Sequence, residues 1–330
     1  MRKLTKFNIR NILIIFSLIS FFILIENNET KAQCFASPGN PIAGSANVGI
    51  LQPRIIRAVG FYRYSFSDQY YRESTPIDYN FPAAVSNANY NFVGFNIGRG
   101  MTKKFSLELE AGYFINKTQR YRHFEDFSRG YGFSNAVISG KFNIFKNVVK
   151  KTEVSVSAGA KLPFTTKPQI VDGVTLDIDL QPSTGNFGTI IQALFVKEVE
   201  GPSLRFIAIG RYEKNFNENQ LGYKFGDAFV SSLYISKHLA NKYTEITKDI
   251  TLILQIRHEY RMKNLRFGEE VYASGNNILF LAPQINYNYN MVWNFSLIYD
   301  VPVYRYYNGT QLGTSHSIAF SVTRDFGFGI

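Results

Sequence analysis

The chain has very few of the residues that staple small folds or bind metals. It contains one cysteine, one tryptophan and four histidines in 330 residues. A single cysteine excludes an internal disulfide and a cysteine-based zinc site. There is no phosphate-binding glycine loop, and after residue 25 no stretch approaches 18 consecutive apolar residues. We therefore predict no metal, no cofactor and no spanning helix after the N-terminal segment.

Acidic residues are also scarce relative to basic ones, and the formal net charge is +11. Residues 1–32 carry three of these net charges, which leaves +8 on the rest of the chain. A basic balance can indicate a nucleic-acid partner. Here the charge is spread evenly and the chain carries an export signal, so we predict no nucleic-acid partner. Attraction to anionic lipid or anionic solutes is the more natural interpretation.

The N-terminus has the layout of a secretory signal peptide. A basic stretch containing Arg2 and Lys6 precedes the apolar run 12–25, and Ala32 and Gln33 flank a plausible cleavage site. The predicted division is a signal peptide at 1–32, an irregular lead-in at 33–52 that could form a small plug, and a barrel at 53–330. Two alternatives are an uncleaved membrane anchor and lipid attachment at Cys34.

Alternation of apolar and polar residues dominates the rest of the chain. In 250–261, Leu252, Leu254 and Ile256 share one strand face, and Gln255 and Arg257 share the other. About a dozen such stretches predict an all-β fold, a transmembrane antiparallel β-barrel of about 12 strands. The predicted strands are 53–66, 87–98, 104–116, 131–144, 152–162, 187–197, 203–213, 225–238, 250–261, 275–289, 293–303 and 316–330. Alternation is poor in 87–98 and 187–197, so the sequence does not decide which face of these two strands points into the barrel.

The predicted connections alternate in length. Short ones lie near 99–103, 145–151, 198–202 and 290–292, and long ones near 67–86, 117–130, 163–186, 262–274 and 304–315. Outer-membrane barrels have short periplasmic turns and longer external loops. The pattern predicts a cell outer-membrane location with both termini periplasmic, although the connection 239–249 is long for a periplasmic turn.

Both ends of the exported chain resemble outer-membrane proteins. The ending SVTRDFGFGI, with Phe326, Phe328 and Ile330 at alternate positions, resembles the C-terminal strand that barrels present to their assembly machinery. The start CFASPGNPIAGSANVGILQPRIIRAVGFYRYSFSD resembles an uncharacterised, transporter-like family of outer-membrane β-barrel proteins of Bacteroidota. The resemblance implies outer-membrane lipid and the barrel assembly machinery as partners, and it leaves the solute unknown.

Charged residues fall on the predicted inner face of the barrel. The lumen-facing candidates are Arg57, Arg63, Lys141, Lys161, Arg205, Arg211, Arg257, Arg261, Glu108, Glu110 and Glu259. One interpretation is a cationic track that selects anionic solutes. The other is that these charges pair across strands and fill a closed lumen. Arg324 is an exception, because it falls on the nominal lipid face.

We predict that the chain is not an enzyme, but a channel or transporter-like protein for small polar or anionic solutes. The alternatives are a closed accessory barrel that docks to an envelope machine and a lipid-modifying enzyme. The enzyme is disfavoured because His316 and Ser317 are adjacent and so point to opposite strand faces. Asp172, Asp177 and Asp179 lie in one long loop, with too few oxygens for a calcium site. We expect that loop to be solvated.

Overall fold

The fold is known from a computed structural model, which describes residues 49–79, 84–122, 127–201, 203–239, 249–289 and 293–327. Among these residues no helix has the length and apolar character needed to cross a membrane. The predicted cleavage site at Ala32 and Gln33, Cys34, and the terminal Phe328 and Ile330 lie outside the described residues.

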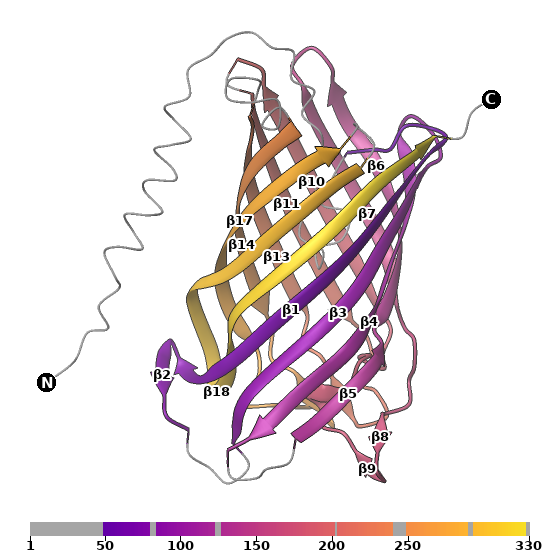
Figure 1. The fold of residues 1–330 in the computed structure, drawn as a ribbon. Helices are drawn as coiled ribbons and strands as arrows, with labels where there is room; N and C mark the ends of the chain where they lie inside the picture. Colours follow the sequence, from indigo (N-terminus) through magenta and orange to yellow (C-terminus); the bar gives the residue numbers. More distant parts are fainter. Residues whose placement is uncertain are drawn as a thin grey trace, which may run out of the picture.

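One antiparallel sheet closes on itself to form a barrel (Figure 1). Each strand pairs with the next along the chain, and the sheet closes where the last strand pairs with the first, from Ile55 opposite Gly327 onward. Closure leaves no free sheet edge. The barrel strands are β1 (Ile55–Glu73), β3 (Val85–Gly100), β4 (Phe105–Tyr121), β6 (Asn135–Asn147), β7 (Thr152–Pro163), β10 (Gly188–Val199), β11 (Leu204–Asn215), β13 (Ala228–His238), β14 (Ile250–Arg261), β17 (Asn276–Tyr289) and β18 (Trp293–Gly327).

The long strand β18 folds back on itself, so that each of its two halves forms one strand of the barrel wall. Its first half pairs with β17 up to Tyr307, and its second half pairs with β1 from Tyr307 onward. The two halves touch, because Ser317 Oγ donates to Asp300 at 3.0 Å. Gly309 near the reversal has φ +70°, a conformation that glycine adopts readily. Ten separate strands and these two halves of β18 cross the barrel twelve times among the described residues, which is consistent with the prediction of about 12 strands.

The two ends of the barrel differ in their connections, as predicted. At the end where β1 begins and β18 finishes, the terminus end, short turns join β3 to β4, β6 to β7 and β10 to β11. The opposite end, the loop end, carries the small elements (Figure 1). These are β2 (Thr75–Ile77), β5 (Phe127–Phe133), β8 (Ile170–Val171), β9 (Val174–Thr175), η2 (Ile178–Leu180), β12 (Tyr223–Lys224), β15 (Leu265–Arg266) and β16 (Glu269–Glu270).

Several expected loops are partly strand, so those predicted boundaries were wrong. The segments 67–86, 117–130 and 304–315 continue the ladders of β1, β3, β4 and β18. The predicted strand 131–144 is divided, because β5 ends at Phe133 and β6 begins at Asn135. Tyrosine-rich and arginine-rich stretches in these regions lack the alternation that marks a half-buried strand. Backbone pairing with a neighbouring strand nevertheless holds them extended.

Large apolar side chains cover the outer surface of the barrel. Phe95, Leu109 and Phe206 are exposed, whereas their polar neighbours Asn96 and Glu108 are buried. An exposed apolar surface of this extent is typical of a membrane interface.

Arg324 lies on the outer face of the barrel, as predicted, and its charge there is stabilised by contacts with aromatic rings. Its guanidinium lies 4.6 Å from the ring centroids of both Trp293 and Phe326. Cation–π contacts of this kind favour a cation among aromatic rings. Because Trp293 begins β18 and Phe326 lies at its other end, Arg324 belongs to the terminus end of the barrel rather than to its middle.

Apolar and polar residues alternate poorly in β3 and β10 because the inner faces of these two strands are not uniformly polar. In β3, Gly94 and Gly98 point inward, where a side chain would meet Phe61 and Leu51. In β10, Leu194 and Val196 are buried inside the barrel with residues of β11, β13 and β14. The interior therefore combines polar groups with an apolar cluster formed by Leu194, Val196, Ile207, Ile209, Tyr234 and Ile253.

Candidate functional site

The predicted lumen-facing charges pair with one another across neighbouring strands. Arg257 is the centre of the first network, which also holds Arg63, Glu259, Arg261 and Asp300. Its Nη1 donates to Asp300 Oδ1 at 2.9 Å and its Nε to Glu259 Oε1 at 2.8 Å. Arg63 Nη2 donates to Asp300 Oδ2 at 2.7 Å, and Arg261 lies 3.7 Å from Glu259 Oε2.

A second network lies on strands β4, β6, β7 and β11. Lys141 Nζ donates to Glu108 Oε1 at 2.5 Å, and Arg211 Nη1 lies 3.2 Å from Glu110 Oε1. Lys161 pairs with Glu213 and also donates to Asn215 Oδ1 at 2.6 Å.

Two further pairs complete the set of predicted cations. Arg57 Nε donates to Asp325 Oδ1 at 2.6 Å, and Arg205 Nε lies 3.4 Å from Glu198 Oε1. Each predicted cation thus has a carboxylate partner, and the charges do not form an unbalanced cationic track. Arg257 and Lys141 are among the largest fully buried side chains, as are Gln255 and Asn286. At their level the interior is packed with side chains.

The end of the lead-in segment enters the barrel at the terminus end. Ile50 N donates to Glu153 Oε1 at 2.9 Å, and Leu51 N donates to Ser106 Oγ at 3.1 Å. Both acceptors belong to the inner face of β7 and β4, and the side chains of Ile50 and Leu51 are each only 6 % exposed. We call Gly49, Ile50 and Leu51 the wedge. It occupies part of the interior near the short turns.

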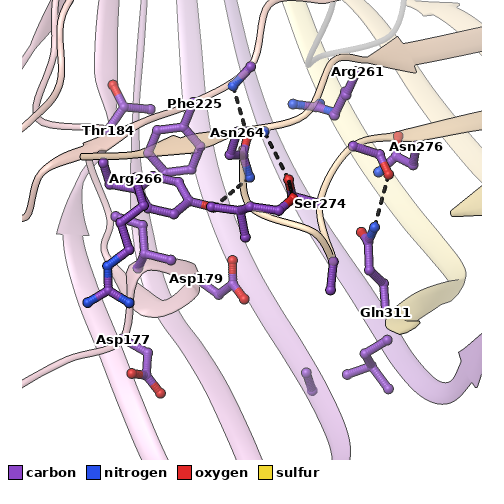
Figure 2. Close-up of a pocket in the computed structure, with 18 of the residues that line it drawn as sticks. Asp177, Asp179, Thr184, Phe225, Arg261, Asn264, Arg266, Ser274, Asn276 and Gln311 are labelled. Atoms are coloured by element: carbon purple, nitrogen blue, oxygen red, sulfur yellow. Dashed lines mark hydrogen bonds between the residues drawn. The ribbon is translucent and has the colours of Figure 1, made fainter. Parts of the chain in front are cut away.

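A cavity of about 1080 Å³ opens at the loop end. The inward-folded loop that carries η2 forms one side, and β14, β15, the end of β1 and the reversal of β18 form others (Figure 2). Leu180 of η2 is buried, and Lys117 Nζ donates to Gln181 O at 2.9 Å, which holds the loop against β4. On the other side of the cavity, Asn264 links the segment between β14 and β15 to β12, because its Nδ2 donates to the hydroxyl of Tyr223 at 2.6 Å.

Asp177 and Asp179 of the 163–186 loop are exposed, as expected, but this loop also folds over the loop-end cavity. Asp177 and Asp179 project from it into this cavity (Figure 2). Burial among the surrounding groups raises the pKa of the Asp179 carboxyl, while the Lys117 ammonium opposes that rise and Asp177 adds to it. Of the predicted inner-face residues, Lys161 and Arg261 also line the cavity. No group of three or more His, Cys, Asp or Glu side chains able to hold a metal occurs within the described ranges.

Replacing Asp179 by asparagine is expected to stabilise the folded protein only slightly at neutral pH, because solvent screens the charge of this exposed side chain. A carboxyl whose pKa is raised on folding is penalised when ionised, and the penalty is lost as the pH falls below the raised value toward the ordinary 3.8. Unfolding of the wild type and of Asp179→Asn should be compared at pH 7 and pH 4. The variant should be more stable at pH 7, and the difference should shrink at pH 4. A constant difference would contradict the assignment.

His316 and Ser317 point to opposite faces, as the strand period predicts. The His316 ring packs against Phe66 at 5.6 Å and Tyr299 at 6.1 Å between centroids, whereas Ser317 is fully buried against Asp300. The two side chains therefore do not form a nucleophile–base pair.

Comparison with known proteins shows the fold. No protein-family model matches the chain, and no curated protein matches it. The COG4313 outer membrane channel from Pseudomonas putida F1 superposes with a TM-score of 0.64 at 10 % identity, covering 90 % of this chain and 100 % of that one. This chain thus has the fold of an outer-membrane β-barrel.

Two other barrels match less well. The translocator domain of the autotransporter NalP from Neisseria meningitidis has a TM-score of 0.44 at 11 % identity, with 84 % and 90 % of the two chains covered. The Ralstonia pickettii toluene transporter TbuX has a TM-score of 0.41 at 10 % identity, with 89 % and 94 % covered. Scores this low support no argument about this chain.

Proposed function

We propose that the chain is an outer-membrane channel that takes up a small polar solute through its loop-end cavity. The observation that carries this proposal is the combination of a closed barrel, an apolar outer surface and a large cavity with polar and charged walls at one end. An apolar band outside and polar groups inside is the arrangement of barrels that span outer membranes. The fold it shares with an outer-membrane channel supports the same location.

The orientation follows from the connections. Short turns and both barrel termini share one end, which we assign to the periplasm, and the long loops then face outward. A cleaved signal peptide at 1–32 delivers the chain. Phe326, exposed near the end of β18, belongs to the segment that we assign to recognition by the assembly machinery. In this orientation the loop-end cavity meets solutes from outside the cell.

The path is closed in two places. The first is the buried networks of paired charges around Arg257 and Lys141, and the second is the wedge at the terminus end. Since each predicted inward cation has a carboxylate partner, the interior favours a solute of balanced charge over a simple anion. Passage requires the wedge to leave and the networks to rearrange.

Conductance in a planar bilayer tests the proposal. The chain from residue 33 should give small or infrequent openings with weak ion selectivity. If the inward arginines line the path, Arg205→Ala should shift the reversal potential under a salt gradient toward cation preference, because it leaves Glu198 without its partner. An unchanged reversal potential in conducting protein would remove the arginines from the path.

A closed accessory barrel is the second candidate function, and the packed interior favours it. Gln255, Asn286 and Asp300 are fully buried among other side chains of the interior. A bilayer that stays silent, with protein shown by circular dichroism to be folded as β-sheet and with the wedge disrupted, would support this candidate over the channel. A stoichiometric partner co-purified from the envelope would then be expected.

A further inference from the structure

Two turns at the terminus end carry positive charge without any acidic residue. The stretches 99–104 and 146–151, which join β3 to β4 and β6 to β7, hold six cations. These are Arg99, Lys103, Lys104, Lys146, Lys150 and Lys151. The loops 163–186, 216–227 and 262–275 at the opposite end together hold four cations and seven acidic residues. The two turns therefore concentrate a positive charge that those loops lack.

The two turns lie side by side and are held by local hydrogen bonds. Asn143 N on β6 donates to Lys104 O at 2.9 Å, so the β3–β4 turn touches the strand that leads into the other turn. Lys104 N donates to Thr102 Oγ1 at 3.1 Å, and Lys150 N donates to Asn147 Oδ1 at 2.7 Å. The backbone that carries these lysines is thus ordered before a ligand arrives, which lowers the entropy cost of binding.

Most of these cations have no carboxylate beside them. Lys146 pairs with Glu153 at 3.4 Å, and Lys151 pairs with Glu200 at 2.6 Å. The other four are exposed and form no ion pair within 4.0 Å with any residue that the structure describes. They are Arg99, Lys103, Lys104 and Lys150. Cations gathered in this way, without internal partners, attract an anionic ligand.

Exposed apolar side chains accompany the cations in both turns. Val148 and Val149 are 76 % and 94 % exposed, and Met101 is exposed as well. On β6, Phe142 and Ile144 belong to the apolar outer surface of the barrel. The basic turns therefore continue the lipid-facing surface beyond the ends of the strands, where headgroups follow the hydrocarbon tails. This continuity favours lipid over a soluble acidic protein as the anionic partner, since basic segments at that level bind anionic headgroups.

We propose that the two turns bind anionic phospholipid, with Lys103, Lys104 and Lys150 at the headgroup phosphates and Arg99 beside them. Lysine and arginine make charge-assisted hydrogen bonds to phosphate oxygens. The proposal rests on the membrane location given under the proposed function and not on the passage of a solute. In the orientation assigned there, the bound lipid belongs to the periplasmic leaflet.

Fluorescence quenching by brominated lipid tests this with the chain from residue 33 in vesicles. In the variant Trp293→Phe/Ile144→Trp, the single tryptophan lies on the outer face of β6 beside the two turns. The vesicles contain equal amounts of phosphatidylglycerol and phosphatidylcholine, and only one of the two lipids is brominated at a time. Brominated phosphatidylglycerol should quench at least about twofold more strongly, because the cations enrich that lipid at the site. Salt at about 1 M should remove the difference by screening.

Adding Lys103→Gln/Lys104→Gln/Lys150→Gln to this variant should make the two lipids quench equally. These three side chains are exposed, so the barrel should fold as before, which circular dichroism checks. Equal quenching by the two lipids before these lysines are replaced would overturn the proposal and leave a soluble acidic partner for the basic turns.

The matched control is Lys167→Gln/Lys214→Gln/Lys224→Gln, which removes the same charge from the loop end and should keep the preference. A preference lost in this control as well would reflect general attraction of anionic lipid to a basic protein, and would overturn the site. Conductance of the same preparation separates the two proposals. A conducting protein without the lipid preference refutes only the lipid site, whereas a silent protein with the preference refutes only the channel.

Discussion

Replacing Arg257 by alanine is expected to lower the free energy of unfolding by about 3–5 kcal/mol, the usual cost of removing one member of a buried ion pair. The Arg257 side chain is 1 % exposed and holds two carboxylates, those of Glu259 and Asp300. Its guanidinium also lies 4.4 Å from the centroid of the Phe280 ring. Without it, Asp300 retains Arg63, and Glu259 retains Arg261 at 3.7 Å and the nearby charge of Arg63. Urea unfolding in lipid vesicles measures the loss.

The matched comparison is Arg122→Ala, since that arginine pairs with Asp78 at the surface. Exposed pairs contribute roughly 0–1 kcal/mol, so this variant should unfold nearly as the wild type does. The double variant Arg257→Ala/Glu259→Gln should recover part of the loss, because it removes one of the stranded charges. A destabilisation of Arg257→Ala no larger than that of Arg122→Ala would show that water reaches the first network.

The double substitution Ile50→Glu/Leu51→Glu is expected to raise single-channel conductance severalfold. Burial of each aliphatic side chain contributes roughly 1.5–3 kcal/mol to holding the wedge inside the barrel. The new carboxylates would also lie near Glu153, which already accepts a hydrogen bond from Ile50 N. Both effects expel the wedge and open the terminus end. Recording in planar bilayers at fixed salt measures the change.

The conservative variant Ile50→Leu/Leu51→Ile serves as its control, because it keeps the apolar bulk and should conduct as the wild type does. An increase in both variants would point to a general loss of packing. No increase in either, from protein that is folded, would mean that the wedge is not what closes the path.

Strand positions could be predicted from the sequence because they depend on local alternation. β14 and β17 lie within one residue of their predicted ranges, since one apolar and one polar face mark each of them clearly. The separation of short turns and long loops to opposite ends of the barrel was also predictable, because it follows from the predicted strand positions. Alternation failed in β3 and β10, where the barrel interior accepts glycine or aliphatic groups and the two faces no longer differ in polarity.

Pairing of charges could not be predicted from the sequence. Arg63 and Asp300 are 237 positions apart, and their contact depends on how β18 folds back and meets β1. The cavity was missed for a similar reason. Asp177 and Asp179 have the sequence context of a solvated loop, and only the inward course of that loop, held by Lys117 at Gln181, brings them over the barrel.

Closure of the barrel between its first and last strands has a kinetic consequence. Arg57 and Asp325 are 268 positions apart and must meet before the sheet has no free edge. Contacts between such distant residues slow folding, because a long chain loses entropy before the contact stabilises it. Until the second half of β18 arrives, β1 exposes unpaired backbone groups that invite aggregation. The second half of β18 therefore decides when the chain is protected from association with other copies of itself.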